Sequence, residues 1–294
     1  MTFEQNMLDY KTTIEEALKN IVFLNCSSNS FHRKLIDSMN YSIHAGGKRL
    51  RPMLLLEANR ILGGDNEKAI PFACAIELIH TYSLIHDDLP AMDDDDLRRG
   101  KPTNHTVYGE AIAILAGDAL LNLAYEIMLE AIEDRRGIDA SRILAESSGS
   151  RGMVGGQSVD VLTEGISVEK DILEYIHMNK TSKLIQAALK MGAALAGGSE
   201  EEMSAFSGFG FHLGMAFQIK DDLLDIEGNE AMLGKPIGSD ATADKNTFPK
   251  IVGIEASKAA LDEHTRIALS EIEKIGGDTV FLKTLASRLL SRNS

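Results

Sequence analysis

Two clusters of aspartates have a spacing that would allow their carboxylates to bind a metal ion together. The first, in the stretch LIHDDLPAMDDDDLRRGKP, contains Asp87, Asp88 and Asp93. The second, in FQIKDDLLD, places Asp221 and Asp225 four residues apart, so that on a helix their Cβ atoms would lie about 5 to 6 Å from each other. Like charges at that spacing repel, and a cation would offset the repulsion. Carboxylate oxygens are hard ligands that favour Mg²⁺.

A proline interrupts the first cluster. Pro90 cannot continue a helical hydrogen-bond ladder, so a helix that reaches Asp87 should end near Leu89. In an unbroken helix the side chains of Asp87 and Asp93 would point about 240° apart, and the break is what could bring Asp93 back toward Asp87. Neither cluster has the spacing of a calcium-binding loop. Taken alone, each cluster could also be a solvated acidic helix face.

The neighbours of the second cluster favour a site over a solvated face. Phe217 and Leu223 are apolar, and Gln218 lies one turn before the carboxylates on their face of the helix. Gly210 and Gly214 lie further upstream near the same face, where missing side chains would leave space for a ligand.

Basic residues accompany the acidic ones. Arg98, Arg99 and Lys101 follow the first cluster, and the earlier stretch GGKRLRP holds Lys48 and Arg51 behind two glycines. Mg²⁺ held by carboxylates takes part of its shell from substrate phosphates, and basic groups can bind the phosphate oxygens that the metal leaves. The sequence therefore indicates a site for a phosphorylated ligand. Read in isolation, GGKRLRP could also be a polar helix start.

The composition excludes several classes of protein. The chain has 294 residues and a formal net charge of −14, which argues against binding to nucleic acid. Its two cysteines, Cys26 and Cys74, make a disulfide framework improbable. The first residues do not resemble a signal peptide, and no run of about 18 apolar residues is evident. We expect a cytoplasmic protein without membrane insertion.

Helical periodicity dominates the chain. Apolar residues recur at three- and four-residue spacing, and strand-like alternation is almost absent. Pro52 and Pro71 stand at expected first-turn positions, and Gly63 and Gly197 begin glycine pairs at expected helix ends. Residues 111–132 are apolar around most of their circumference, which predicts burial on all sides. We expect one all-α domain over residues 1–294, a bundle of about ten or more helices.

Together these motifs resemble the trans-isoprenyl diphosphate synthases (polyprenyl synthetases), and most closely the bacterial farnesyl diphosphate synthases. Asp87, Asp88 and Asp93 match the first aspartate-rich motif of that family, D-D-x4-D. The second motif, D-D-x-x-D, matches the stretch DDLLD. The resemblance also covers GGKRLRP, RRGKPTNH, GGQSVD, KTSKL, GMAFQIKDDLLD, LGKPIGSD and DKNTFPKIVG. It implies an all-α fold around a central cavity and a homodimer.

The resemblance also implies roles for individual residues. Isopentenyl diphosphate would lie on Gly47, Lys48, Arg51, His80 and Arg99. The allylic diphosphate would be held by Arg98, Lys180 and Lys235, and by Mg²⁺ on Asp87, Asp93 and Asp221, with three ions when substrates are bound. Thr181 and Gln218 would face the carbon that becomes cationic, and Asp88 belongs to the catalytic set. Without the resemblance, His80 could be a core histidine and the two lysines ordinary surface residues.

The implied reaction joins isopentenyl diphosphate head to tail to dimethylallyl or geranyl diphosphate and releases pyrophosphate. Tyr82 and Ser83, five and four residues before Asp87, would limit the product to the fifteen carbons of farnesyl diphosphate. A geranylgeranyl or other chain-length synthase is the alternative, and a non-catalytic helical partner subunit is a further one. The second motif is not that of a terpene cyclase.

Overall fold

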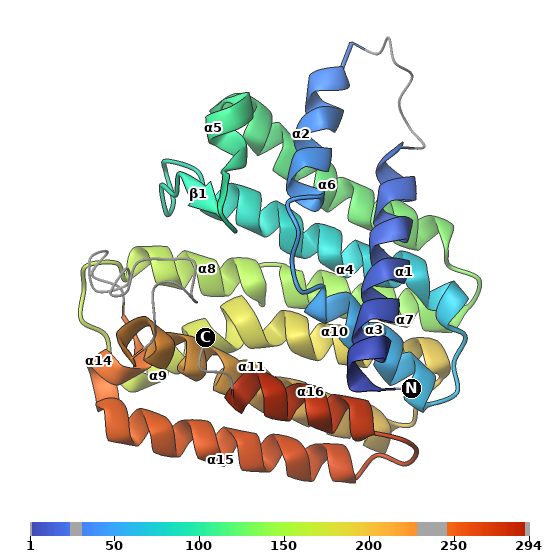
Figure 1. Ribbon diagram of the computed structural model, residues 1–294, viewed down its shortest axis with the longest axis vertical. Helices are drawn as coiled ribbons and strands as arrows, with labels where there is room; N and C mark the ends of the chain where they lie inside the picture. The colour runs from blue at the N-terminus through green and yellow to red at the C-terminus, as the bar shows by residue number, and fades with distance from the viewer. Residues whose placement is uncertain (1, 24–30, 228–245, 292–294) are drawn as a thin grey trace. The chain divides into compact units, whose positions relative to one another are not determined.

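The computed structural model describes residues 2–23, 31–227 and 246–291. The described chain is helical apart from one two-stranded hairpin, which confirms the predicted all-α fold (Figure 1). The elements are α1 (Phe3–Phe23), α2 (Arg33–Ile43), α3 (Leu50–Ile61), α4 (Asn66–Asp87), β1 (Leu97–Arg98), β2 (Lys101–Pro102), α5 (Asn104–Tyr108), α6 (Glu110–Glu130), α7 (Arg135–Ser148), α8 (Met153–Leu162), α9 (Lys170–Ile176), the π-helix η1 (His177–Ser182), α10 (Lys183–Ala196), α11 (Glu200–Glu227), α14 (Phe248–Val252), α15 (Ile254–Glu273) and α16 (Val280–Ser291).

The chain forms two compact units, which are described separately. Unit 1 comprises residues 1–56 and 65–141, and unit 2 comprises residues 57–64 and 142–294. The helices α3 and α7 therefore contribute residues to both units. The prediction of one polyprenyl synthetase domain over 1–294 stays a prediction.

In unit 1, α4 and α6 run side by side (Figure 1). Asp65 caps α4, because its side chain accepts a hydrogen bond from the backbone N–H of Glu67 at 2.9 Å. This cap starts the helix before Pro71, which lies inside α4 and not in its first turn. The expectation for Pro71 was wrong because the Asp65 cap precedes it by six residues. The expected helix end at Gly197 is confirmed, since this residue caps α10 with a φ of 80°.

The predicted burial of residues 111–132 on all sides is also wrong. Ile114, Leu115 and Leu129 of α6 are 44%, 51% and 66% exposed. Apolar periodicity around a helix shows that every face could be buried, but it does not show what covers each face. In unit 1, α2, α4 and α5 pack on α6 and leave these three side chains uncovered.

Both α4 and α6 are long and apolar enough to cross a membrane by length and composition alone. The most apolar window of α4 is 67% buried inside the protein and that of α6 is 33% buried. A buried core helix passes the same test, and α4 has twelve buried residues along its length. Two such helices are weak evidence for a membrane span. Both helices are nevertheless more apolar than expected, because no apolar run of that length was evident in the sequence.

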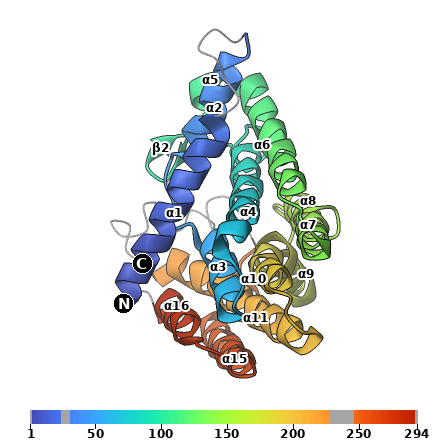
Figure 2. The same cartoon turned by 90° about the vertical axis from the view of Figure 1, so that its right-hand side faces the viewer.

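In unit 2, the 28-residue helix α11 packs against α10 and α15 (Figure 2). It also packs against η1, and α8 covers another part of the π-helix. Glycines allow both α11 and α8 to approach the backbone of η1 closely. A Cβ atom at Gly214 of α11 would lie 2.6 Å from Ser182 Cα, and one at Gly156 of α8 would lie 2.8 Å from Asn179 Cβ. The small residues thus let the backbone of η1 sit directly against its neighbours.

Candidate active site

A glycine-rich loop between α2 and α3 carries the first group of predicted ligands. Gly46 and Gly47 have φ values of 96° and 143°, which other residues rarely adopt. Lys48 is exposed in this loop and Arg51 lies in the first turn of α3. A side chain at Gly47 would collide with the guanidinium of Arg99, because its Cβ would lie 2.6 Å from Arg99 Nη1. Glycine therefore makes room for the arginine.

Arg99 reaches this loop from a tight hairpin. β1 and β2 pair antiparallel, and the two residues between them, Arg99 and Gly100, have φ values of 55° and 74°. Positive φ at both positions is typical of the type I′ turns that join twisted strands. The turn aims the guanidinium of Arg99 at the carbonyl oxygen of Gly46, to which Nη1 donates a hydrogen bond.

The predicted ligands of isopentenyl diphosphate in unit 1 form a site rich in positive charge. Burial lowers the pKa of Arg51 to about 10, Glu77 acts in the opposite direction, and the charge of Arg99 lowers it further. The Nε atom of Arg51 is buried and has no hydrogen-bond partner among the described residues. Burial, with the nearby arginines, also lowers the pKa of His80 well below its ordinary value, so the imidazole is neutral at pH 7. Crowded cations with an unsatisfied donor fit an anionic ligand.

The first aspartate motif folds back on itself as expected. α4 ends at Asp87, and the backbone N–H of Asp93 donates to the backbone oxygen of Asp87 at 2.8 Å. The side chain of Asp88 is 4% exposed and accepts from Arg98 Nε at 2.5 Å. Burial raises the pKa of Asp88, and Arg98 opposes that shift. Asp87 and Asp93 are partly exposed, and Asp88 is buried against Arg98.

The two residues expected to set product length lie in the same helix. Tyr82 is 6% exposed, its ring stands edge-on to His86 with centroids 5.7 Å apart, and burial raises its pKa to about 12. Ser83 is half-buried and donates its hydroxyl to the carbonyl oxygen of His80 at 3.0 Å. Tyr82 therefore has the firm packing of a barrier, and Ser83 is bound to its own helix.

In unit 2, the π-helix η1 presents Lys180 and Thr181. π-Helices occur often at functional sites, since the extra residue per turn redirects side chains. Lys180 Nζ lies 2.6 Å from Asp160 Oδ2 on α8. The hydroxyl of Thr181 donates to Gln218 Oε1 at 3.0 Å. Gln218 in turn donates through Nε2 to Asp222 Oδ1 at 3.0 Å.

The buried carboxylate of Asp222 ends this chain of hydrogen bonds. Its Oδ2 accepts from the backbone N–H of Phe248 at 2.8 Å, and His177 Nε2 lies 3.5 Å away. Burial and the charge of Lys180 lower the pKa of His177 to about 3, so this ring is neutral. Asp222 thereby fixes which end of the Gln218 amide faces Thr181. Asp221 and Asp225, in contrast, stay partly exposed on α11.

The donor sets of both motifs fit Mg²⁺. Unit 1 has partly exposed carboxylates at Asp87 and Asp93, and unit 2 has one at Asp221. Among the described residues no three His, Cys, Asp or Glu side chains gather as a complete metal site. Mg²⁺ does not require one, because it commonly uses one or two carboxylates, waters and substrate phosphates. Lys235 lies outside the described residues.

Several residues that organise the site escaped the sequence analysis. Asp160 ends the stretch GGQSVD, four residues after Gly156, and the sequence did not indicate that it would bind Lys180. Asp222 was read only as part of a motif, although its apolar neighbours could have indicated burial. No sequence pattern indicated the partners of Arg49, which come from three separate segments.

Comparisons with known proteins agree with these features. The polyprenyl synthetase family model matches residues 32–276. The chain belongs to the polyprenyl synthetase family. It is 43% identical to a farnesyl diphosphate synthase of Geobacillus stearothermophilus, over all of this chain and 99% of that protein. It is 47% identical to the farnesyl diphosphate synthase of Bacillus subtilis, over 79% of each chain.

Relatives with other product names also match. A chloroplastic geranylgeranyl pyrophosphate synthase of Catharanthus roseus is 43% identical over 92% of this chain and 75% of that protein. Among solved structures, a geranyltransferase of Helicobacter pylori, complexed with magnesium and isoprenyl diphosphate, superposes with a TM-score of 0.83. It is 32% identical, and the match covers 97% of this chain and 96% of that one. Family membership confirms the predicted enzyme class, a prenyltransferase.

Proposed function

We propose that this polyprenyl synthetase condenses isopentenyl diphosphate with dimethylallyl or geranyl diphosphate to give farnesyl diphosphate and pyrophosphate. The observation that carries the proposal is that two like-charged side chains, Arg51 and Arg99, lie beside the Gly46–Gly47 loop, and that the buried Nε of Arg51 has no partner among the described residues. Such concentrated positive charge suits a diphosphate. The farnesyl diphosphate synthases of Geobacillus stearothermophilus and Bacillus subtilis, both above 40% identity, support the fifteen-carbon product.

The two units supply different parts of the proposed chemistry. In unit 1, Gly47, Lys48, Arg51, His80 and Arg99 would bind isopentenyl diphosphate. Arg98, together with Lys180 and Lys235, would bind the allylic diphosphate. Thr181 and Gln218 would direct oxygen dipoles at the allylic carbon as positive charge develops there. No side chain needs to act as a covalent nucleophile.

We assign Asp87, Asp93 and Asp221 as ligands of Mg²⁺, with three ions when substrates are bound. Bound Mg²⁺ would act as a Lewis acid that neutralises the leaving diphosphate. Asp88 would act through Arg98, because its buried carboxylate is already hydrogen-bonded to that side chain. Arg98 and Lys180 would add direct charge stabilisation to the leaving group.

Each condensation balances without a further reactant: geranyl diphosphate needs one condensation to reach fifteen carbons, and dimethylallyl diphosphate needs two. The C–O bond of the allylic diphosphate breaks, its carbon forms a C–C bond to the double bond of isopentenyl diphosphate, and the product loses one proton to the departing pyrophosphate. The chain's own residues bind and orient both diphosphates and keep water from the cation. Tyr82 would stop elongation at fifteen carbons.

We also propose a cytoplasmic homodimer without membrane insertion. The exposed side chains of Ile114, Leu115 and Leu129 on α6 give each copy an apolar face that a second copy would cover. Light scattering after size exclusion should report twice the mass of one chain. Leu115→Glu should shift that mass toward the monomer, and a monomeric wild type would remove this part of the proposal.

A product assay tests the main proposal. Incubation with isopentenyl and geranyl diphosphate in Mg²⁺ should give farnesyl diphosphate on chromatography. EDTA or Asp93→Asn should stop elongation, whereas Asp9→Asn on the exposed face of α1 should leave it unchanged. No metal-dependent elongation would overturn the proposal. Products longer than fifteen carbons would favour a geranylgeranyl or longer-chain synthase.

A further inference from the structure

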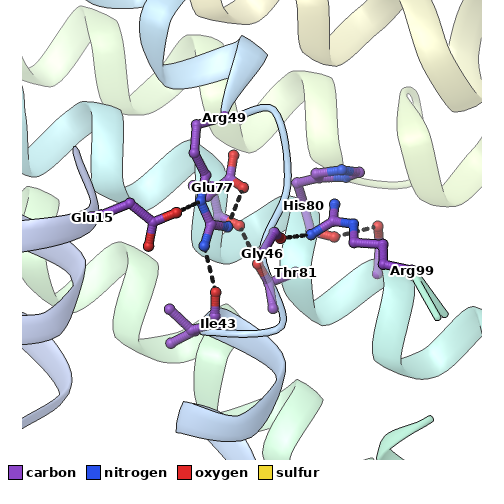
Figure 3. A network of polar contacts seen from close by, with 9 residues as sticks. Glu15, Ile43, Gly46, Arg49, Glu77, His80, Thr81 and Arg99 are labelled. Atoms are coloured by element: carbon purple, nitrogen blue, oxygen red, sulfur yellow. Dashed lines mark hydrogen bonds and ion pairs between the residues drawn. The ribbon is translucent and has the colours of Figure 1, made fainter. Parts of the chain in front are cut away.

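Arg49 stands between Lys48 and Arg51 in sequence, but its side chain takes a separate direction. Its φ is 49°, a left-handed conformation that non-glycine residues avoid. Its side chain is fully buried. Figure 3 shows its guanidinium directed toward Glu15 and Glu77 and not toward His80 or Arg99. The unfavourable backbone geometry must therefore be stabilised by what this side chain contacts.

Three charge-assisted hydrogen bonds hold the guanidinium (Figure 3). Nε donates to Glu15 Oε1 of α1 at 2.8 Å, and Nη1 donates to Glu77 Oε1 of α4 at 2.7 Å. Nη2 donates to the carbonyl oxygen of Ile43, the last residue of α2, at 2.5 Å. Burial alone would lower the pKa of Arg49, but Glu15 and Glu77 raise it above its ordinary value. One side chain thus joins three helices to the loop.

These contacts leave Arg49 unavailable to a phosphate. Its charge is matched by two carboxylates, of which Glu77 is only 3% exposed. The situation of Arg51 is the opposite, because its Nε atom has no partner among the described residues. Two arginines two residues apart therefore have different roles: Arg49 is bound on all three nitrogens by the protein, and Arg51 has a donor that suits a ligand.

Glu77 connects the buried contacts of Arg49 to α4, the helix that carries His80. It lies one turn before His80 and Thr81 on α4, and the Thr81 hydroxyl donates to the Glu77 carbonyl oxygen at 2.8 Å. At the other end of the loop, Arg99 donates to the carbonyl oxygen of Gly46. The loop is thus held at Gly46 and at Arg49, on either side of Gly47 and Lys48.

We propose that Arg49 is a positioning residue for isopentenyl diphosphate: its buried contacts with Glu15, Glu77 and Ile43 hold the loop in its ligand-binding shape before the ligand arrives. Arg49 does not touch the substrate. The inference rests on the proposed function, since it assumes that the loop receives this diphosphate. Preorganisation of this kind acts on affinity, because a loop that samples other shapes binds with its affinity reduced by the competent fraction.

Steady-state kinetics on Arg49→Gln tests the proposal. The KM for isopentenyl diphosphate should rise about tenfold or more, while the KM for geranyl diphosphate stays within about twofold, because only one in ten loops would then be competent. Arg49→Lys should recover part of the loss, since an ammonium can keep one carboxylate but not all three acceptors. Arg60→Gln is the matched control. It removes an arginine of α3 that is likewise paired with a glutamate, Glu57, and should leave both KM values unchanged.

A purely structural role would give a different pattern. Equal changes in both KM values, or an unchanged KM for isopentenyl diphosphate in folded Arg49→Gln, would overturn the proposal. If Arg49→Gln does not fold, Glu15→Gln decides, because Glu15 is 30% exposed and its loss leaves the Glu77 contact intact. Glu15→Gln should raise the KM for isopentenyl diphosphate about threefold. Its thermal unfolding midpoint should equal that of Arg60→Gln, which shows that the rise does not come from lost stability. No selective rise in Glu15→Gln would reject the role.

Inorganic pyrophosphate separates this inference from the proposed function. The proposed allylic site binds its diphosphate through Mg²⁺ as well as through Arg98, Lys180 and Lys235, so EDTA weakens it, and calorimetry of Arg98→Gln in EDTA reports mainly on the basic site around the Gly46–Gly47 loop. Binding by Arg98→Gln that weakens about tenfold when Arg49→Gln is added supports the positioning role even if no elongation is observed. Equal affinity in the two proteins would overturn the role even if wild type makes farnesyl diphosphate.

Discussion

One polar network in each unit shows how differently the two parts of the site are built. Around the Gly46–Gly47 loop of unit 1 the network is charged: Arg49 is matched by two glutamates, and the buried Nε of Arg51 has no hydrogen-bond partner in the described part of the chain. In unit 2, neutral groups pass hydrogen bonds from Thr181 through Gln218 to the single carboxylate of Asp222. The first arrangement concentrates positive charge and the second orients dipoles.

This difference matches the two tasks of the proposed reaction. A diphosphate carries several negative charges and is bound best by crowded, partly desolvated arginines. A developing carbocation needs oxygen dipoles fixed in advance and no strong nucleophile nearby. Substitutions in the charged network of unit 1 should therefore act mainly on the KM for isopentenyl diphosphate, and substitutions along the hydrogen-bond chain from Thr181 to Asp222 should act mainly on kcat.

The largest expected effect is from Arg51→Gln. Removing one cation from the basic site should lower kcat/KM for isopentenyl diphosphate about 100- to 1000-fold, since truncating one partner of a buried charge contact commonly removes 2 to 5 kcal/mol. Steady-state assays measure the change. Arg33→Gln, an exposed pair with Asp37 on α2, is the control and should behave as wild type. A loss confined to kcat would break the comparison for unit 1.

A somewhat smaller effect is expected from Asp222→Asn. The amide has nearly the same shape but donates hydrogen bonds where the carboxylate accepts them, so Gln218 and the Phe248 N–H lose a charged acceptor. We expect kcat to fall about 10- to 100-fold, which corresponds to 1.5 to 3 kcal/mol for hydrogen bonds to a charged group. The KM for isopentenyl diphosphate should stay within twofold. Asp262→Asn, exposed on α15, is the control.

The sequence predicted the local features of this site well. The return of Asp93 to Asp87 followed from one proline, and the structure confirms it with a backbone hydrogen bond. Helix content followed from apolar periodicity. These features depend on residues close together in the chain, so local stereochemistry determines them.

Features that depend on distant partners could not be predicted in this way. In the sequence Arg49 is one of several basic residues, and its partners Glu15, Ile43 and Glu77 lie in other segments that only the fold brings to it. Asp222 looked equivalent to Asp221, but burial against α14 gives it a different role. The exposure of the apolar side chains on α6 likewise depends on which faces of this helix its neighbours cover. Periodicity describes one helix and cannot report its neighbours.

Tyr82→Ala should change the product more than the rate. The ring is buried in unit 1, and its removal would open space along α4. We expect products longer than fifteen carbons by chromatography, with elongation slowed less than about tenfold, because no diphosphate contact is lost. Ser83→Ala should have a small effect, since the Ser83 hydroxyl is bound to the His80 carbonyl. An unchanged product from Tyr82→Ala would assign chain length to other residues.

The smallest expected effect concerns a second neutral contact of unit 2, between α11 and α15. His212 Nδ1 and His264 Nδ1 lie 2.9 Å apart, so one ring must donate and the other accept. Burial lowers the pKa of both rings; Glu271 and Glu263 oppose this at His212, and the neighbouring His212 adds to it at His264. Because the unfolded histidines bind protons more readily, the free energy of unfolding should fall as the pH drops below about 6.5. Denaturant titrations from pH 7 to 5 should show a shallower fall in His264→Gln, which cannot take up the second proton. An equal slope in both proteins would show that this contact does not depend on neutral rings, and it would weaken the contrast between the two units.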